Sequence, residues 1–372
     1  MKLAVLLMVR DEAKNVCDVI AAASSATKTF VLCDTGSEDD TVRIATEFCA
    51  EHGLELHVYH DEWENYSHNR CVALDHAYKH GEWVLQLSGD EYLHDGEKLA
   101  GLIDKLETTG ETACYLRLRS GMYETTSPRL VKARAGWIWE GQIHESVRNL
   151  DRTLVPAPRS MQDPWIEHCE SDFARKQARY PKDLETLLGE TGTPAQYLRS
   201  FFYLGWTYEA LGRHDDALIA YNMRMFLSGN PEEEWFTRFR RACCMERCGV
   251  AWAEIQDAHL KNYATRPWRA EPLADIARHW LSVEHWELAN LFARMGLAIP
   301  YPEGEAGIVM HDVYSWRLAD IVAETSLKCE RADLALGAKC AAKVAPQFPG
   351  DPRVMMYCAA YRKRGLEVES VG

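Results

Sequence analysis

The N-terminal part of the chain alternates between short apolar runs and longer segments of mixed polarity. The first run, Leu3–Met8, is entirely apolar, which is typical of a strand buried on both faces of a sheet. The segments after the first two runs have helix-forming composition. The expected strands are Leu3–Met8, Thr29–Cys33, Leu54–Tyr59 and Trp83–Leu87, and the expected helices are Ala13–Ala23 and Asp39–Glu51. This alternation predicts an α/β domain with a mostly parallel sheet covered on both faces.

From about Phe173 onward the strand pattern disappears and the chain reads as helical pairs. In Tyr203–Tyr221, large and small residues alternate at helical spacing around a turn at Gly212. This segment matches a tetratricopeptide repeat of about 34 residues. We therefore expect two domains, residues 1–170 and residues 171–372, the second being an all-α, tetratricopeptide-like solenoid.

Polar residues directly follow three of the expected strands. Because ligands bind beyond the carboxyl ends of the strands in such sheets, these side chains are expected to converge. Acidic residues at the end of a buried strand are costly unless they hold a cation or orient a ligand. The alternative is that Asp90 and Glu91 only cap the next helix. The residues concerned are Arg10, Asp11, Asp34, Ser37, Asp90 and Glu91.

Composition narrows the class of protein. No apolar run in the 372 residues approaches the roughly 18 needed to span a membrane, so we expect a cytoplasmic protein without a membrane span. The twelve cysteines show no CxxC pair and no Cys/His zinc spacing, which indicates reduced core thiols. The net charge of -14 disfavours free binding to a polyanion. Residues 114–160 carry eight Lys and Arg against four Asp and Glu, which leaves a local phosphate-facing patch open.

The order of motifs along the first part of the chain is more specific than any single motif. The motifs are Met8–Glu12 with Asn15, Asp34–Ser37 with Asp39 and Thr41, Asn69–Arg70, and Gly81–Trp83 leading to Gly89–Glu91. In this order they resemble the family 2 glycosyltransferases, which have the nucleotide-sugar-binding GT-A fold, a Rossmann-like architecture. Gly141–Glu145 and the helical tail are similar to a subgroup in which the transferase domain is fused to tetratricopeptide-like repeats.

The resemblance implies a donor site for a nucleotide sugar, most simply a UDP-sugar. Asp90 stands at the last aspartate of the family's DxD motif and is expected to bind Mn2+ or Mg2+, with His144 as a further ligand. Arg70 would approach the diphosphate as a fixed cation. Ser88 replaces the usual first aspartate of the motif, which leaves strict metal dependence open. The remaining donor-binding residues expected are Arg10, Asp11, Asp34, Ser37 and Gly89.

Family 2 enzymes generally invert the anomeric carbon, which requires a base on the acceptor side. Glu145 is the first candidate, Glu140 the second and Glu91 the third. The alternative for Glu145 is a residue that positions its neighbours or caps a helix.

Three functions follow as hypotheses. The leading one is an inverting glycosyltransferase that moves a hexose or N-acetylhexosamine from a UDP-linked sugar to a macromolecular acceptor, which is a glycan, a protein side chain or a hydroxylated nucleobase. The alternative is an inactive transferase-like scaffold that binds a partner through its helical repeats. A nucleotidyltransferase is the weakest reading, because no Lys/Arg-rich Gly loop follows the first strand.

Overall fold

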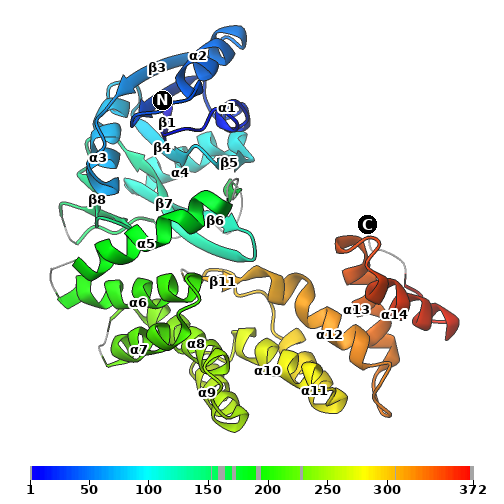
Figure 1. Cartoon of the computed structure of the whole chain (residues 1–372). Helices are drawn as coiled ribbons and strands as arrows, with labels where there is room; N and C mark the ends of the chain where they lie inside the picture. The colour runs from blue at the N-terminus through cyan, green and yellow to red at the C-terminus, as the bar shows by residue number, and fades with distance from the viewer. Residues whose placement is uncertain are drawn as a thin grey trace. The chain divides into compact units, whose positions relative to one another are not determined.

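The computed structural model describes residues 2–151, 153–157, 164–169, 173–189, 194–226, 229–305 and 307–368 (Figure 1). The chain forms two compact units, Met1–Glu190 and Thr191–Gly372. The sequence predicts the domain boundary between residues 170 and 171. Helix α5 (Phe173–Gly189) follows that position in the chain and belongs to the first unit. Within the described residues, no helix has both the length and the apolar character needed to cross a lipid bilayer.

A mixed sheet forms the centre of the first unit. Its strand order is β3-β2-β1-β4-β7-β6-β10-β5. The part from β3 to β4 is parallel, as the sequence predicts. The remainder is not mostly parallel, because β7 runs antiparallel to β4 and β6, and β5 runs antiparallel to β10. The strands are β1 (Leu3–Val9), β2 (Thr29–Asp34), β3 (Glu55–His60), β4 (Trp83–Ser88), β5 (Glu91–His94), β6 (Ala113–Ser120), β7 (Tyr123–Lys132) and β10 (Trp165–His168).

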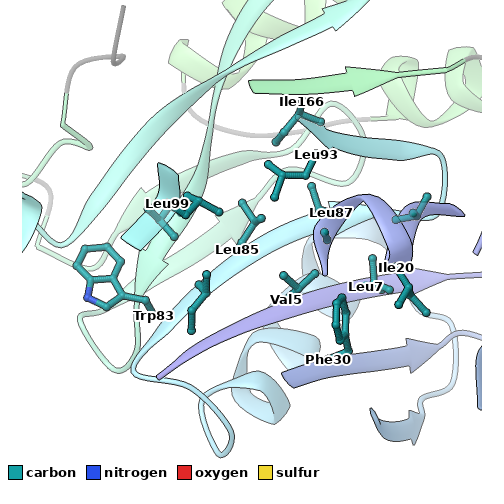
Figure 2. Packing of buried hydrophobic residues seen from close by; sticks show 14 of the residues in the cluster. Val5, Leu7, Ile20, Phe30, Trp83, Leu85, Leu87, Leu93, Leu99 and Ile166 are labelled. Carbon is teal, nitrogen blue, oxygen red and sulfur yellow. The ribbon is translucent and has the colours of Figure 1, made fainter. Parts of the chain in front are cut away.

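The two faces of β1 explain its unbroken apolar run. Val5 and Leu7 belong to one buried cluster, whereas Ala4 and Leu6 belong to another. Figure 2 shows the first of these clusters, with Phe30 of β2 beside the two β1 side chains. Each fully buried side chain of this size stabilises the fold by about 1.5–3 kcal/mol. The paired strands therefore need coverage on both sides.

Helices and a hairpin provide that coverage. The first cluster draws residues from α1 (Val16–Ala23), α2 (Thr41–Glu51) and α4 (Leu99–Thr109), which the short helix η1 (Gly96–Lys98) precedes. The second cluster draws residues from α3 (Tyr66–Ala77) and from the two-stranded sheet of β8 (Trp137–Glu140) and β9 (Ser146–Asn149). Both faces of the sheet are thus covered, and the loops that carry the site follow the ends of its strands.

The second unit is helical apart from the two-residue strand β11 (Val309–Met310) within its described residues. Each helix packs against the next one along the chain, which is the contact pattern of stacked helical hairpins. The predicted helical pairs are therefore confirmed, and the tetratricopeptide assignment stays a prediction. The helices are α6 (Pro194–Ala210), α7 (His214–Met225), α8 (Pro231–Arg247), α9 (Trp252–Thr265), α10 (Glu271–Ser282), α11 (Trp286–Leu297), η2 (Val313–Arg317), α12 (Leu318–Thr325), α13 (Leu334–Val344), η3 (Ala345–Gln347) and α14 (Pro352–Lys363).

Gly205 allows α6 and α7 to approach closely. A methyl group added at Gly205 would overlap the ring of Tyr221, which is fully buried and donates a hydrogen bond to Glu209 at 2.6 Å. We expect Gly205→Ala to lower the free energy of unfolding by about 2 kcal/mol, because overpacking costs typically 1–3 kcal/mol or more and outweighs alanine's helix propensity of roughly 1 kcal/mol. Urea unfolding monitored by circular dichroism measures the change.

The matched control is Gly101→Ala in α4, where an added Cβ meets nothing within 4 Å. This variant is expected to be as stable as the wild type or more stable, since only the helix propensity changes. A Gly205→Ala protein no less stable than the Gly101→Ala protein would contradict close packing at the α6–α7 contact.

Candidate functional site

The loops that follow β1 and β2 are tied together by polar contacts. Asp34 accepts hydrogen bonds from the backbone N–H of Ser37 at 3.1 Å and from its hydroxyl at 2.5 Å. The same hydroxyl oxygen accepts from the backbone N–H of Asp11 at 3.0 Å. Asp11 in turn accepts from the backbone N–H of Glu38 at 2.8 Å and has a left-handed backbone, with φ 55°. Asp11, Asp34 and Ser37 thus converge, and Arg10 lies beside them, with its Nε 3.8 Å from Asp11 Oδ2.

The end of β4 reaches the same edge of the sheet. In the register of the parallel pair, Ser88 lies opposite Met8 of β1. Gly89 packs directly against Glu12, because a Cβ added there would lie 2.5 Å from Glu12 Cγ. A side chain at this position would have to displace the Glu12 side chain. The glycine therefore keeps Asp90 close to the loop that follows β1.

Asp90 is held by a histidine that the sequence argument missed. His168 Nε2 lies 3.0 Å from Asp90 Oδ2, and His168 Nδ1 lies 3.0 Å from Ser120 Oγ. Burial alone raises the pKa of the Asp90 carboxyl, but His168 and Arg129 outweigh it and hold the pKa below its ordinary value. Asp90 is therefore a carboxylate at neutral pH. His168 Nε2–H donates to the ionised carboxylate and orients it, as an outer partner orients a carboxylate that binds a divalent cation.

Glu91 fixes the turn around Asp90 from inside the protein. One of its carboxylate oxygens accepts from the backbone N–H of Ser88 at 2.8 Å, and the other accepts from Arg129 Nη2 at 2.6 Å. Glu91 and Arg129 are both buried. Arg129 Nε and Nη1 are also buried and have no hydrogen-bond partner among the described residues. The positively charged Arg129 therefore has two N–H donors without partners beside the Ser88–Asp90 turn. This arrangement favours an anionic ligand.

Arg70 and Glu145 form an ion pair between α3 and the loop before β9. Arg70 Nε lies 2.5 Å from Glu145 Oε1, and each side chain is only 12% exposed. The Arg70 guanidinium also lies over the Trp139 ring, 4.8 Å from its centroid. Burial by itself raises the pKa of Glu145, but Arg70 and then Arg129 outweigh it and hold the pKa below its ordinary value. Glu145 is thus ionised, which is the form that accepts a proton.

These charged groups belong to one electrostatic network. Burial lowers the pKa of Arg129, and the charges that act on it are Glu91, Arg70, Glu145 and Asp90. Two arginines and three carboxylates therefore influence one another at this edge of the sheet. Such an arrangement can hold a cation at Asp90 and an anion at the arginines.

Glu140 ends β8, and His144 lies in the loop between β8 and β9. His144 is exposed and has a left-handed backbone, with φ 51°. Within the described residues, His144, Asp90 and His168 do not form a compact three-ligand group. Glu140 is half-buried. His144 as a metal ligand stays a prediction, and His168 is the imidazole that contacts Asp90.

Comparisons with known proteins bear on the first unit. Residues 5–161 match the model of glycosyl transferase family 2. A comparison with curated protein sequences finds no match. Among solved structures, S. aureus TarS 1-349 in complex with UDP-GlcNAc is similar over 98% of this chain and 93% of its own, with 12% identity and a TM-score of 0.37.

Two further solved structures are similar over smaller parts of the chain. The mannosyltransferase PcManGT from Pyrobaculum calidifontis, in complex with GDP-Man and Mn2+, is similar over 71% of this chain and 88% of its own, with 15% identity and a TM-score of 0.39. Glucosyl-3-phosphoglycerate synthase from Mycobacterium tuberculosis, in complex with Mn2+, UDP and phosphoglyceric acid, is similar over 32% and 43%, with 17% identity and a TM-score of 0.25.

Proposed function

We propose, from the match of residues 5–161 to the model of glycosyl transferase family 2, that the protein is an inverting, metal-assisted transferase. It moves a hexose or N-acetylhexosamine from a UDP-linked sugar to a macromolecular acceptor. The observation that carries this proposal is the ionised Asp90 with His168 on one oxygen, next to the buried Arg129. This set of groups suits a divalent cation that bridges the protein and a diphosphate.

In this proposal the loops after β1 and β2 bind the nucleoside. The carboxylates of Asp11 and Asp34 are acceptors, and the ribose hydroxyls and the base N–H of a uridine are donors. The hydroxyl and backbone N–H of Ser37 hold Asp34 in a single orientation. A pre-oriented carboxylate loses little conformational freedom when the donor binds. Arg10, which is exposed beside Asp11, closes this part of the site.

The diphosphate lies between the arginines and the Asp90–His168 pair. Mn2+ or Mg2+ held by the Asp90 carboxylate would neutralise charge on the leaving nucleoside diphosphate. Arg129 fits this role because two of its buried donors have no partner among the described residues. Arg70 supplies a second fixed cation. Ser88 carries no charge, so Asp90, held in place by His168, is the carboxylate expected to bind the ion.

Glu145 acts as the base on the acceptor side. As an acceptor hydroxyl oxygen bonds to the anomeric carbon, the bond from that carbon to the diphosphate breaks and the hydroxyl proton passes to the Glu145 carboxylate. Attack opposite the leaving group inverts the anomeric centre. The acceptor is a glycan, a protein side chain or a hydroxylated nucleobase, and stacked helical hairpins suit such extended partners.

The test is a panel of UDP-glucose, UDP-galactose, UDP-N-acetylglucosamine and GDP-mannose incubated with the full chain and Mn2+, Mg2+ or EDTA. We expect release of UDP from one donor with a metal and loss of at least about 100-fold of the rate in EDTA, since metal stabilisation of the leaving group is worth several kcal/mol. Chromatography of the nucleotide measures the rate. Absence of binding and release with every donor would contradict the enzyme and favour the scaffold.

A further inference from the structure

Three consecutive helices of the second unit bring a cysteine, a histidine and an aspartate together. Cys243 lies on α8, His259 on α9 and Asp275 on α10. The spacing is 16 residues in each step, about one helix and one turn. One possible ligand atom from each of the three residues lies within 4.8 Å of the other two. The cluster lies entirely within the second unit.

The aspartate uses its two oxygens for different partners. Oδ2 lies 3.2 Å from Cys243 Sγ. Oδ1 faces Arg278 Nε at 3.5 Å and Arg317 Nη1 at 3.8 Å. The arginines thus fix the carboxylate orientation from one side and leave Oδ2 directed at the thiol. Carboxylates that bind metals are commonly oriented by such outer partners.

His259 presents an unsatisfied nitrogen. His259 is only 2% exposed, and its Nδ1 atom is buried without a hydrogen-bond partner among the described residues. An unsatisfied buried polar group costs about 1–3 kcal/mol. Burial also lowers the pKa of His259, although Asp275 and Glu246 oppose this, so the ring is neutral. A neutral imidazole with an unused lone pair is the form that binds a metal.

We propose that Cys243, His259 and Asp275 bind one transition-metal ion, with Zn2+ as the fitting ion, and that this ion pins α8, α9 and α10 together. Mixed sulfur, nitrogen and oxygen ligands suit Zn2+ and exclude Mg2+ and Ca2+, which take oxygen ligands. Ligand atoms around a tetrahedral Zn2+ lie about 3.5 Å apart at bond lengths of 2.0–2.3 Å. The ligand atoms, which lie within 4.8 Å of one another, therefore need to approach by about 1.3 Å at most. Water completes the coordination.

Binding converts the Cys243 thiol to a thiolate and releases its proton to solvent. Cys243 is the partly exposed member of a cluster whose other two members are buried. Without an ion, burial and then Asp275 raise the pKa of Cys243 well above its ordinary value, so the group is a thiol that hydrogen-bonds to the carboxylate. The competing explanation is that this thiol–carboxylate contact is purely structural. The two explanations predict opposite results on adding metal.

The test uses the full chain with Asp90→Asn, so that the proposed donor site does not compete for metal. The protein is treated with chelator under a reductant, dialysed and titrated with Co2+ as a spectroscopic probe for Zn2+. We expect a thiolate-to-cobalt charge-transfer band in the near ultraviolet and visible bands typical of four-coordinate Co2+. Both should saturate at one equivalent and disappear on addition of Zn2+. Absence of the thiolate band in this protein would overturn the proposal.

Variants assign the ligands. Cys243→Ser should abolish the charge-transfer band, and His259→Gln and Asp275→Asn should weaken Co2+ binding at least about 10-fold. Cys248→Ser is the matched control, because Cys248 is the C-cap of the same helix and lies outside the cluster. A band that survives Cys243→Ser would also overturn the proposal. Far-UV circular dichroism checks the fold of each variant. If a variant does not fold, the Co2+ titration of the Asp90→Asn protein, in which all three cluster residues are present, decides the question.

Discussion

Asp90→Asn is expected to lower kcat with the matching donor by about 100-fold or more. The amide keeps an oxygen at the position of Oδ2, so it still accepts a hydrogen bond from His168 and the loop retains its shape. It removes the negative charge that binds the cation, and metal stabilisation of a leaving diphosphate is worth several kcal/mol. Initial rates of UDP release over a series of Mn2+ concentrations measure the effect. A kcat within a few-fold of the wild type would contradict metal binding by Asp90.

His168→Asn should have a smaller effect on the rate than Asp90→Asn, and this effect should arise from a weaker affinity for Mn2+. We expect the Mn2+ concentration for half-maximal rate to rise about 10-fold, with kcat largely restored at high Mn2+. The matched control is His94→Asn, because His94 Nε2 lies 2.8 Å from Glu167 Oε2 in a similar pair on the neighbouring strand β5. If both variants shift the Mn2+ dependence equally, then His168 acts through general stability and does not orient the Asp90 carboxylate for the metal.

Strands β1, β2 and β4 of the parallel half were predictable because both of their faces are buried. A strand such as β1 then consists of apolar residues only, and the polar residue that ends it stands out. The other half could not be found in this way. Strand β7 contains Pro128 and polar side chains, and β5 and β10 are four residues long each. Their positions depend on pairing with distant segments, which periodicity within a single window does not report.

The same distinction explains which site residues were found. Asp34 and Asp90 follow strands of the parallel half, so their convergence is a consequence of topology. His168 is 78 residues from Asp90 in the chain and follows no recognisable strand. The Arg70–Glu145 pair joins residues that are 75 positions apart in the chain. The sequence alone suggests Arg70 for the diphosphate and Glu145 for the acceptor, and it does not indicate that the two side chains meet. The twelve cysteines are free thiols and all but Cys169 are at least partly buried, as expected from the sequence, but zinc spacings within one loop do not describe groups such as Cys243 with His259, which lie on successive helices.

Glu145→Gln is expected to lower kcat by roughly 100- to 10,000-fold, the range that general base catalysis contributes. Glutamine has nearly the same shape, and its amide oxygen can still accept from Arg70 Nε, but it takes up no proton under these conditions. Arg70 lowers the basicity of Glu145 as long as they are paired, so a donor diphosphate that draws Arg70 away would strengthen the base at the moment it is needed. Donor affinity should change only a few-fold.

The kinetic parameters separate this role from the alternative, in which Glu145 only positions Arg70. If Glu145 is the base, Glu145→Gln lowers kcat and removes the acidic limb of the pH–rate profile. If Glu145 only positions Arg70, the same variant raises the KM for the donor, because Arg70 no longer meets the diphosphate. Glu140→Gln is the matched control, since Glu140 is the preceding candidate on β8 and is half-buried. A large loss of kcat in Glu140→Gln with little change in Glu145→Gln would move the base to the end of that strand.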